Sequence, residues 1–159
     1  MIDLRSDTVT LPCSEMRQFM FDSPLGDDVY GEDPSVNRLQ ELAAEVTGKE
    51  SALFVSSGTQ SNLLAVLSQC DRGDEYIAGQ ESHTYQFEAG GAAVLGAVQP
   101  QPLSFNDRGE LDLGQVAATV KPNDFHFAKT KLLCLENTQT GRVLAMDYLA
   151  DFARLAAKH

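Results

Sequence analysis

Apolar residues along the chain recur at spacings that predict helices alternating with short strands. Every third or fourth residue is apolar between Ser35 and Gly48, which predicts a helix that Ser35 caps and Gly48 ends. The apolar run Ser51–Val55 predicts a buried strand, and a polar break then leads into a helix that ends near Cys70. Residues 56–59 therefore form a turn between a strand and the start of a helix.

The second half of the chain repeats this alternation. Strands are predicted at Glu75–Ala78 and Lys131–Leu135, and helices at Asp112–Val120 and Met146–Ala157. Alternating short strands and helices are typical of an α/β fold with a mainly parallel sheet. Because the chain ends on a helix, where such a chain would continue with a strand, we expect an incomplete sheet. Residues 1–34, punctuated by proline and glycine, are predicted to be an irregular N-terminal segment.

Charge and cysteine content narrow the possible functions. The 159 residues include 12 Lys and Arg against 23 Asp and Glu, a net charge of −11. An acidic surface repels phosphate backbones and anionic lipids, so we expect neither a nucleic-acid nor a membrane partner. The three cysteines are far apart and form neither a disulfide framework nor a zinc motif. The first residues do not resemble a signal peptide and no apolar run is long enough to span a bilayer, so we expect a cytoplasmic protein.

The polar turn after the first predicted strand is a candidate phosphate site. Ser57, Gly58 and Thr59 lie at a helix start, which presents unpaired N–H groups and partial positive charge. Gly58 would let the backbone approach a ligand closely, and the two hydroxyls could add hydrogen bonds. The pattern is neither GxGxxG nor a Walker loop, so it is not a nucleotide motif. The alternative is an ordinary helix cap followed by a glycine turn.

Two histidines are candidates for acid–base chemistry. His83 follows the strand Glu75–Ala78, at the end of a parallel sheet where α/β proteins bind ligands, so it could act as a base or stack on an aromatic ligand. The alternative is a solvated loop histidine. His126 lies between two phenylalanines before the strand Lys131–Leu135, and from the residues alone a partly buried structural role is favoured there. Glu136–Thr138 follow that strand and should face the same cleft as His83, unless they only form a polar turn.

Five segments, taken in order, resemble the low-specificity L-threonine aldolases. They are MIDLRSDTVT at residues 1–10, GDDVYGEDP at 26–34, SGTQ at 57–60, FEAGGA at 87–92 and LENT at 135–138. The resemblance implies the fold of type I pyridoxal-phosphate enzymes, with residues 35–159 as the first part of the cofactor-binding large domain. It also implies pyridoxal 5′-phosphate as cofactor, a small β-hydroxy-α-amino acid as substrate, and a homo-oligomer, either dimer or tetramer. The reaction would be cleavage of L-threonine or L-allo-threonine to glycine and acetaldehyde.

The same resemblance implies roles for individual residues. Ser57, Gly58 and Thr59 would hold the cofactor phosphate. His83 would stack on the cofactor ring near the substrate hydroxyl, where it could transfer a proton, and His126 would approach the substrate from another part of the pocket. The other residues that the resemblance assigns to the substrate pocket are Ser6, Tyr30 and Phe87, with Glu88 and Asn137 behind them.

Parts of that family's active site have no counterpart in these residues. The lysine that holds the cofactor, the aspartate that pairs with its ring nitrogen and the substrate-binding arginines lie further along the family's chains. None of Lys121, Lys129, Lys131 and Lys158 lies in a matching motif. We therefore expect the 159-residue chain alone to lack aldolase activity.

Two other functions are compatible with the same residues. One is a different pyridoxal-phosphate lyase of this fold, such as a phenylserine aldolase or a β-eliminating enzyme. The other is a non-catalytic α/β module that binds a phosphate-bearing ligand. We expect no metal site, since the adjacent Asp27 and Asp28 make a poor ligand set without further oxygens nearby.

Overall fold

The computed structural model describes residues 3 and 6–159, except for the side chain of Asp7. Part of the first motif, residues 1, 2, 4 and 5, lies outside the described residues. The chain divides into two compact units, residues 1–54 and residues 55–159, and each is described by itself. The domain boundary expected after residue 34 stays a prediction.

The first unit contains the predicted helix α2, Pro34–Thr47, but its cap differs from the one expected. The carboxylate of Asp33 accepts hydrogen bonds from the backbone N–H groups of Ser35 and Val36, at 2.9 and 3.0 Å. The expectation that Ser35 is the cap is therefore wrong, because proline at the first helical position moves the helix start toward the N-terminus. Gly48 ends the helix as expected, in the left-handed conformation with φ 63°.

A second helix in this unit corrects the expectation of irregular chain before residue 35. It is α1, Ser14–Asp22, and a short 3₁₀ turn, Asp7–Val9, precedes it. Met16, Phe19 and Met20 have helical spacing, although no residue of α1 is buried. The frequent prolines and glycines around the helix conceal this short pattern in the sequence.

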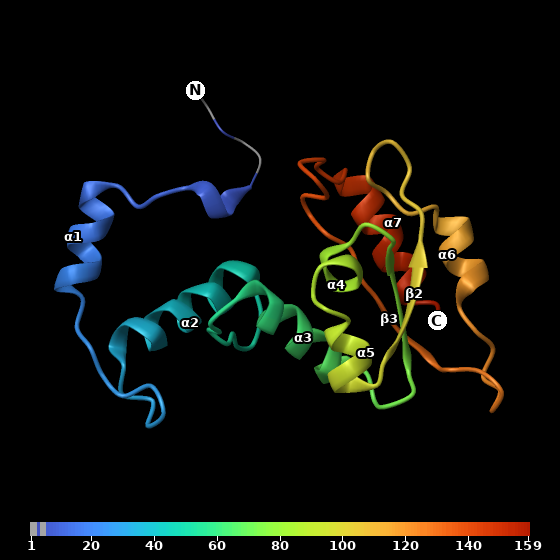
Figure 1. Ribbon diagram of the computed structural model, residues 1–159, viewed down its shortest axis with the longest axis horizontal. Helices are drawn as coiled ribbons and strands as arrows, with labels where there is room; N and C mark the ends of the chain where they lie inside the picture. The colour runs from blue at the N-terminus through green and yellow to red at the C-terminus, as the bar shows by residue number, and fades with distance from the viewer. Residues whose placement is uncertain (1–2, 4–5) are drawn as a thin grey trace. The chain divides into compact units, whose positions relative to one another are not determined.

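The second unit is built on a three-stranded parallel sheet, which confirms the expected fold class (Figure 1). Its strands are β1, Glu75–Gly79, β2, Gln99–Leu103, and β3, Thr130–Leu133. Their order is β2-β1-β3, and β1 pairs in parallel with both neighbours. The central strand β1 is buried along its whole length, as expected for a strand between two others with both faces covered.

Helices cover both faces of this sheet. On one face, Tyr76 and Ala78 pack in a cluster with residues of α3, Gly58–Gln69, and α5, Gly91–Gly96. On the other face, Ile77 packs in a cluster with residues of α6, Leu113–Thr119, and α7, Met146–Ala156. This alternation of faces along β1 is the period of a strand. A short helix, α4, His83–Gln86, follows β1.

The strand expected at Ser51–Val55 is absent from the structure. These residues are irregular, and most of them are exposed. The backbone N–H of Phe54 instead donates to the side-chain oxygen of Gln40 at 2.9 Å. An apolar run becomes a strand only where a neighbouring strand takes its hydrogen bonds, and no strand within residues 3 and 6–159 pairs with this one. The sequence shows the apolar run but not whether it has a partner.

A buried glutamate joins the three strands at the amino-terminal end of the sheet. Glu75 is fully buried, and its carboxylate accepts hydrogen bonds from Gln99 at 2.9 Å and Thr130 at 3.0 Å. Lys121 forms an ion pair with the same carboxylate, and burial lowers the pKa of the lysine. This cluster explains how an ionised carboxylate is tolerated in the interior, since every partner is a donor.

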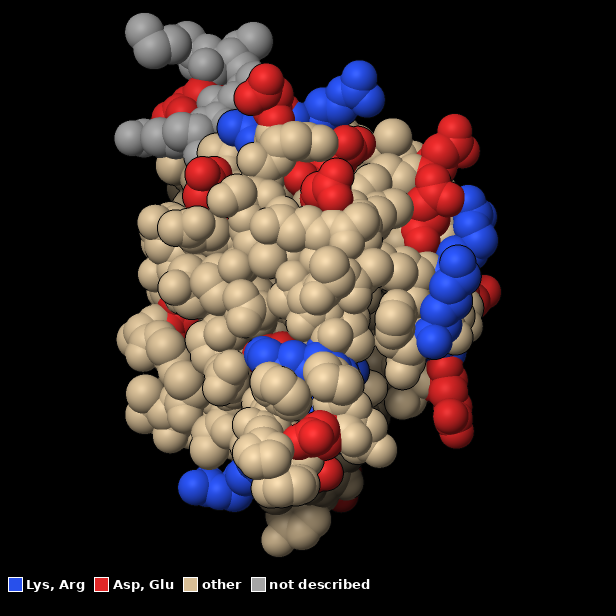
Figure 2. Space-filling model, turned by 90° about the vertical axis from the view of Figure 1, so that its right-hand side faces the viewer, with Lys and Arg blue, Asp and Glu red and all other residues tan. Residues whose placement is uncertain are grey.

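The surface agrees with the acidic composition. On the face shown in Figure 2, acidic and basic side chains are interspersed with broad uncharged areas, and there is no continuous basic patch on that face. Within the part of the chain that the structure describes, no helix combines the length and the apolar character needed to cross a bilayer.

Candidate active site

The start of α3 has the properties expected of a phosphate site. Ser57 caps the helix, since its hydroxyl accepts from the backbone N–H of Gln60 at 3.1 Å. The N–H groups of Gly58 and Thr59 precede the first helical hydrogen bonds, so helix geometry leaves them without partners inside the helix. A Cβ placed on Gly58 would meet no atom within 4 Å, so the space beside this residue is open. The first turn also carries no acidic residue that would repel an anion.

His83 lies at the carboxyl-terminal end of β1, as the sequence predicts. It is the first residue of α4, and its side chain is 52% exposed. Tyr76 of β1 anchors this short helix, because its hydroxyl donates to the carbonyl oxygen of Thr84 at 3.1 Å. Burial raises the pKa of Tyr76 to about 12, so this hydroxyl stays protonated near neutral pH. His83 is therefore an exposed side chain on a firmly held backbone.

A buried carboxylate binds the ring of His83 and links it to α3. The Nδ1 atom of His83 lies 2.7 Å from Oε1 of Glu88, whose side chain is only 5% exposed. The side-chain amide of Asn62, in α3, donates to the same oxygen at 2.7 Å. The helix that begins at the candidate phosphate site thus supports the histidine through two side chains. The sequence places Asn62 and Glu88 26 residues apart and gives no signal for this contact.

The segment after β3 reaches the same place. The backbone N–H of His83 donates to Oε1 of Glu136, which follows the strand. This contact agrees with the expectation that Glu136–Thr138 face the cleft, since the carboxyl ends of parallel strands lie on one side of a sheet. Asn137 instead accepts from the backbone N–H of Leu144, at 3.3 Å.

A groove adjoins this cluster between α3 and β3. It has a volume of about 350 Å³, and its polar residues include Asn62, Ser82, Thr84 and Glu136. The hydroxyl oxygens of Ser82 and Thr84 are buried without a hydrogen-bond partner among the described residues. Neither the α3 start nor the ring of His83 lines it.

The structure does not bring His126 together with His83 in one chain. His126 lies in the loop before β3, at the opposite end of the sheet from the loop after β1. The five residues of β1 span about 16 Å at roughly 3.3 Å per residue. The loop of His126 and the loop of His83 are therefore separated by a distance of this order. The side chain of His126 is 67% exposed and contacts Asp124 two residues away at 2.7 Å. A partly buried structural role for His126 is therefore wrong.

The remaining predicted residues divide between the two units. Phe87 lies one helical turn after His83, and the centroids of their two rings are 5.6 Å apart. Ser6 and Tyr30 belong to the first unit, and both are exposed there. The hydroxyl of Ser6 lies 2.8 Å from that of Thr8. The roles expected of Ser6 and Tyr30 at the substrate stay predictions.

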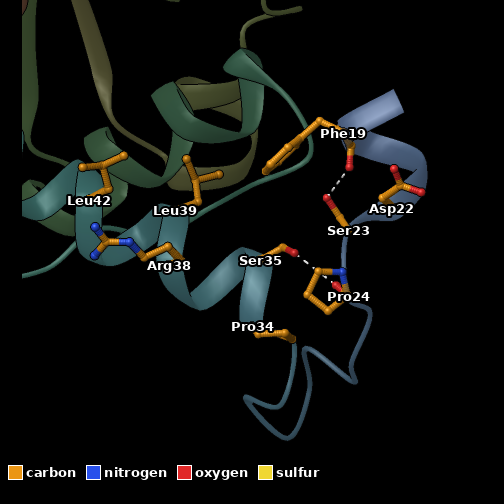
Figure 3. Close-up of a pocket in the computed structure, with 9 residues that line it drawn as sticks. All are labelled: Phe19, Asp22, Ser23, Pro24, Pro34, Ser35, Arg38, Leu39 and Leu42. Carbon is orange, nitrogen blue, oxygen red and sulfur yellow. Dashed lines mark hydrogen bonds between the residues drawn. The ribbon is translucent and has the colours of Figure 1, made fainter. Parts of the chain in front are cut away.

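An apolar pocket in the first unit lies among residues with no expected chemistry. It has a volume of about 430 Å³ and is formed by the end of α1 and the start of α2. Figure 3 shows Phe19 from α1 and Leu39 from α2 on opposite sides of it. Hydrogen bonds from Ser23 to the Phe19 carbonyl, at 2.7 Å, and from Ser35 to the Pro24 carbonyl, at 3.0 Å, hold its rim. None of its nine residues is a predicted site residue.

Comparison with known protein sequences identifies a family. The family model described as beta-eliminating lyase matches residues 3–159. The chain is 60% identical over 151 residues to the low specificity L-threonine aldolase of Escherichia coli (strain K12), covering 95% of this chain and 45% of that protein. It is 45% identical over 164 residues to a probable low-specificity L-threonine aldolase 2 of Arabidopsis thaliana, covering 99% of this chain and 46% of that protein. The chain thus spans about half the length of these curated relatives.

Comparison with solved structures confirms the fold. A threonine aldolase of Leishmania major matches with a TM-score of 0.73 and 23% identity, covering 91% of this chain and 42% of that one. DesV of S. venezuelae matches with a TM-score of 0.58 and 20% identity, covering 90% of this chain and 34% of that one. The three strands described here therefore correspond to part of a larger fold.

Proposed function

Since this chain belongs to the family of beta-eliminating lyases, we propose that the protein, at the length of its relatives, is a low-specificity L-threonine aldolase. It would cleave L-threonine and L-allo-threonine to glycine and acetaldehyde with pyridoxal phosphate. The observation that supports this most directly is that His83 is joined, through Glu88 and Asn62, to the helix whose start suits a phosphate. A cytoplasmic location and a homo-oligomer belong to the same proposal.

The described residues suit the phosphate end of this cofactor. The free N–H groups at the start of α3, the open space beside Gly58 and the absence of an acid in the first turn all favour a bound phosphate. Ser57, Gly58 and Thr59 would hold it, with the Ser57 hydroxyl donating while it still caps the helix. When bound, pyridoxal phosphate supplies an electron sink for the charge that carbon–carbon cleavage leaves behind.

His83 would move the proton in this reaction. Its Nδ1 atom is bound to Glu88, so Nε2 is the ring atom that could accept the proton of the substrate's β-hydroxyl. That oxygen becomes the aldehyde oxygen as the bond between Cα and Cβ breaks. Phe87, beside His83, would border the space for the substrate side chain and exclude water from it.

The residues named above, which would hold the phosphate and move the proton, include neither the lysine nor the aspartate that would pair with the cofactor. Lys121, for example, is already paired with Glu75 at the opposite end of the sheet from His83. We therefore expect no threonine cleavage by the 159-residue chain alone. His126 lies at that opposite end as well, so it would act from a second copy of the chain in an oligomer.

A substitution at His83 tests the proposal. In the protein at the length of its relatives, His83→Ala should lower kcat for threonine about 10²- to 10⁴-fold, the range that a positioned proton-transfer group contributes. Glu81→Gln, an exposed change in the same loop, is the matched control and should keep wild-type kcat. A His83→Ala variant that binds the cofactor and turns over at the wild-type rate would refute the role of His83. Parallel assays with threonine, allo-threonine and phenylserine would separate this function from that of a related lyase.

A further inference from the structure

The side chain of Glu88 is largely buried, although it contacts an exposed histidine ring. Its side chain is 5% exposed, yet the ring that it contacts is 52% exposed. One of its oxygens, Oε1, receives both the Asn62 amide and the His83 ring, each at 2.7 Å. A carboxylate placed in the interior needs such donors to offset its lost hydration. A single oxygen of Glu88 thus joins a side chain of α3 to the ring of His83.

We propose that Glu88 is a positioning residue for His83, and that it fixes the imidazole as the Nδ1–H tautomer and leaves Nε2 as the ring's only proton acceptor. The physical reason is that an ionised carboxylate has no hydrogen to donate. A neutral imidazole 2.7 Å away must therefore donate from Nδ1. Asn62 donates to the same carboxylate oxygen through its amide nitrogen, so this contact adds a second donor and leaves Glu88 as the acceptor for the ring.

Two further contacts limit the movement of His83. Its backbone N–H donates to Glu136, and its α4 turn is held by the hydroxyl of Tyr76 through the Thr84 carbonyl. The backbone of His83 is thus held at two points, and its ring is held at Nδ1. Rotation of the ring would break the short hydrogen bond between Nδ1 and the buried carboxylate of Glu88. The ring orientation is therefore set before any ligand arrives. The consequence for catalysis rests on the proposed function, whereas the tautomer does not.

The tautomer is measured directly in the 159-residue chain. Nitrogen-15 NMR of the labelled histidine rings distinguishes Nδ1–H from Nε2–H, and we expect Nδ1–H at His83. Glu88→Met fills a similar volume without an acceptor, so it should shift His83 toward Nε2–H. Glu88→Gln keeps an oxygen that can accept from both Asn62 and the ring, so it should retain Nδ1–H. Glu81→Gln, in the same loop, should change nothing.

The kinetic test uses the protein at the length of its relatives, loaded with pyridoxal phosphate. Glu88→Met should lower kcat for threonine about 10²-fold, near the lower limit of proton-transfer effects, with KM changed much less. Glu88→Gln should fall between Glu88→Met and the wild type, because it orients the ring but cannot stabilise a protonated one.

The two measurements separate the possible failures. An Nε2–H tautomer at His83 in the wild-type chain overturns the positioning role without any variant having to fold. Wild-type kcat in Glu88→Met overturns it as well. If the wild-type protein failed to cleave threonine at all, the proposed function would be lost, and the tautomer would still decide whether Glu88 sets the ring.

Discussion

The two histidine–carboxylate pairs of the second unit have the same contact distance but different surroundings. In each pair, Nδ1 lies 2.7 Å from a carboxylate oxygen. Glu88 is 5% exposed and also binds Asn62 from another helix, whereas Asp124 is 45% exposed and lies two residues from His126. A contact between two residues of the same loop is formed and lost locally. A contact between buried groups far apart in the sequence depends on the fold.

This difference shows how firmly each histidine ring is held. The ring of His83 is held by an interior charge, and its backbone is held by Glu136. The ring of His126 lies in the open against Phe125, with 3.9 Å between the ring centroids. A reaction that needs one fixed ring geometry is served by the first arrangement. The second would require a partner surface to fix the ring.

Co-expression of two single-histidine variants should give the largest effect that the comparison predicts. If each active site takes His83 from one chain and His126 from another, a hybrid dimer of His83→Ala and His126→Ala chains contains one intact site of two. Random assembly makes half of the dimers hybrids, so co-expression should restore about a quarter of wild-type activity. Activity of the co-expressed sample no higher than the mean of the two separate variants would show that His126 is not supplied by a second chain.

Deleting each carboxylate should separate the pairs by stability. Glu88→Ala leaves the amide of Asn62 unsatisfied in a partly buried position, so we expect the free energy of unfolding to fall by about 2–3 kcal/mol. Asp124→Ala removes an exposed carboxylate and should leave the urea midpoint unchanged within error. Urea unfolding followed by circular dichroism measures both. Equal losses of stability would mean that burial does not distinguish the two pairs.

The smallest expected effect is the titration of the exposed pair. The backbone N–H of His126, and after it the ring, hold the pKa of Asp124 below its ordinary value. A carboxyl whose folded pKa is lowered stabilises the loop above its ordinary pKa, and this stabilisation is lost as the pH falls through the lowered value. The amide signal of His126 in NMR should therefore titrate below the range of a free aspartate. In Asp124→Asn this titration should disappear, and a midpoint at the ordinary aspartate value would contradict the loop contact.

Much of the fold follows from the sequence because it depends on local pattern. The helix α2, the strands β1 and β3 and the helix α7 all have apolar spacing that identifies them, and parallel pairing follows from their alternation. Ser51–Val55 has the composition of a strand but no partner among the described residues, and composition alone cannot supply one. The sequence conceals the helix α1 for the opposite reason, since prolines and glycines surround a short helical pattern.

The candidate site was predicted only in part. Sequence order places His83 and Glu136 at the same end of a parallel sheet, and the structure joins them. Motif resemblance places Glu88 behind the residues of the substrate pocket, but no pattern indicates that Asn62 holds it. Nor does the sequence distinguish a buried Glu75, paired with Lys121, from any other acidic residue at the start of a strand. Such contacts depend on three-dimensional packing of segments that are distant in the chain.

Product analysis of the protein at the length of its relatives tests the central claim most directly. Incubated with L-threonine and pyridoxal phosphate, it should release glycine and acetaldehyde in equal amounts. Removal of the cofactor should abolish both products, and its return should restore them. No cleavage of threonine by the loaded protein, or cleavage that persists after the cofactor is removed, would contradict the account.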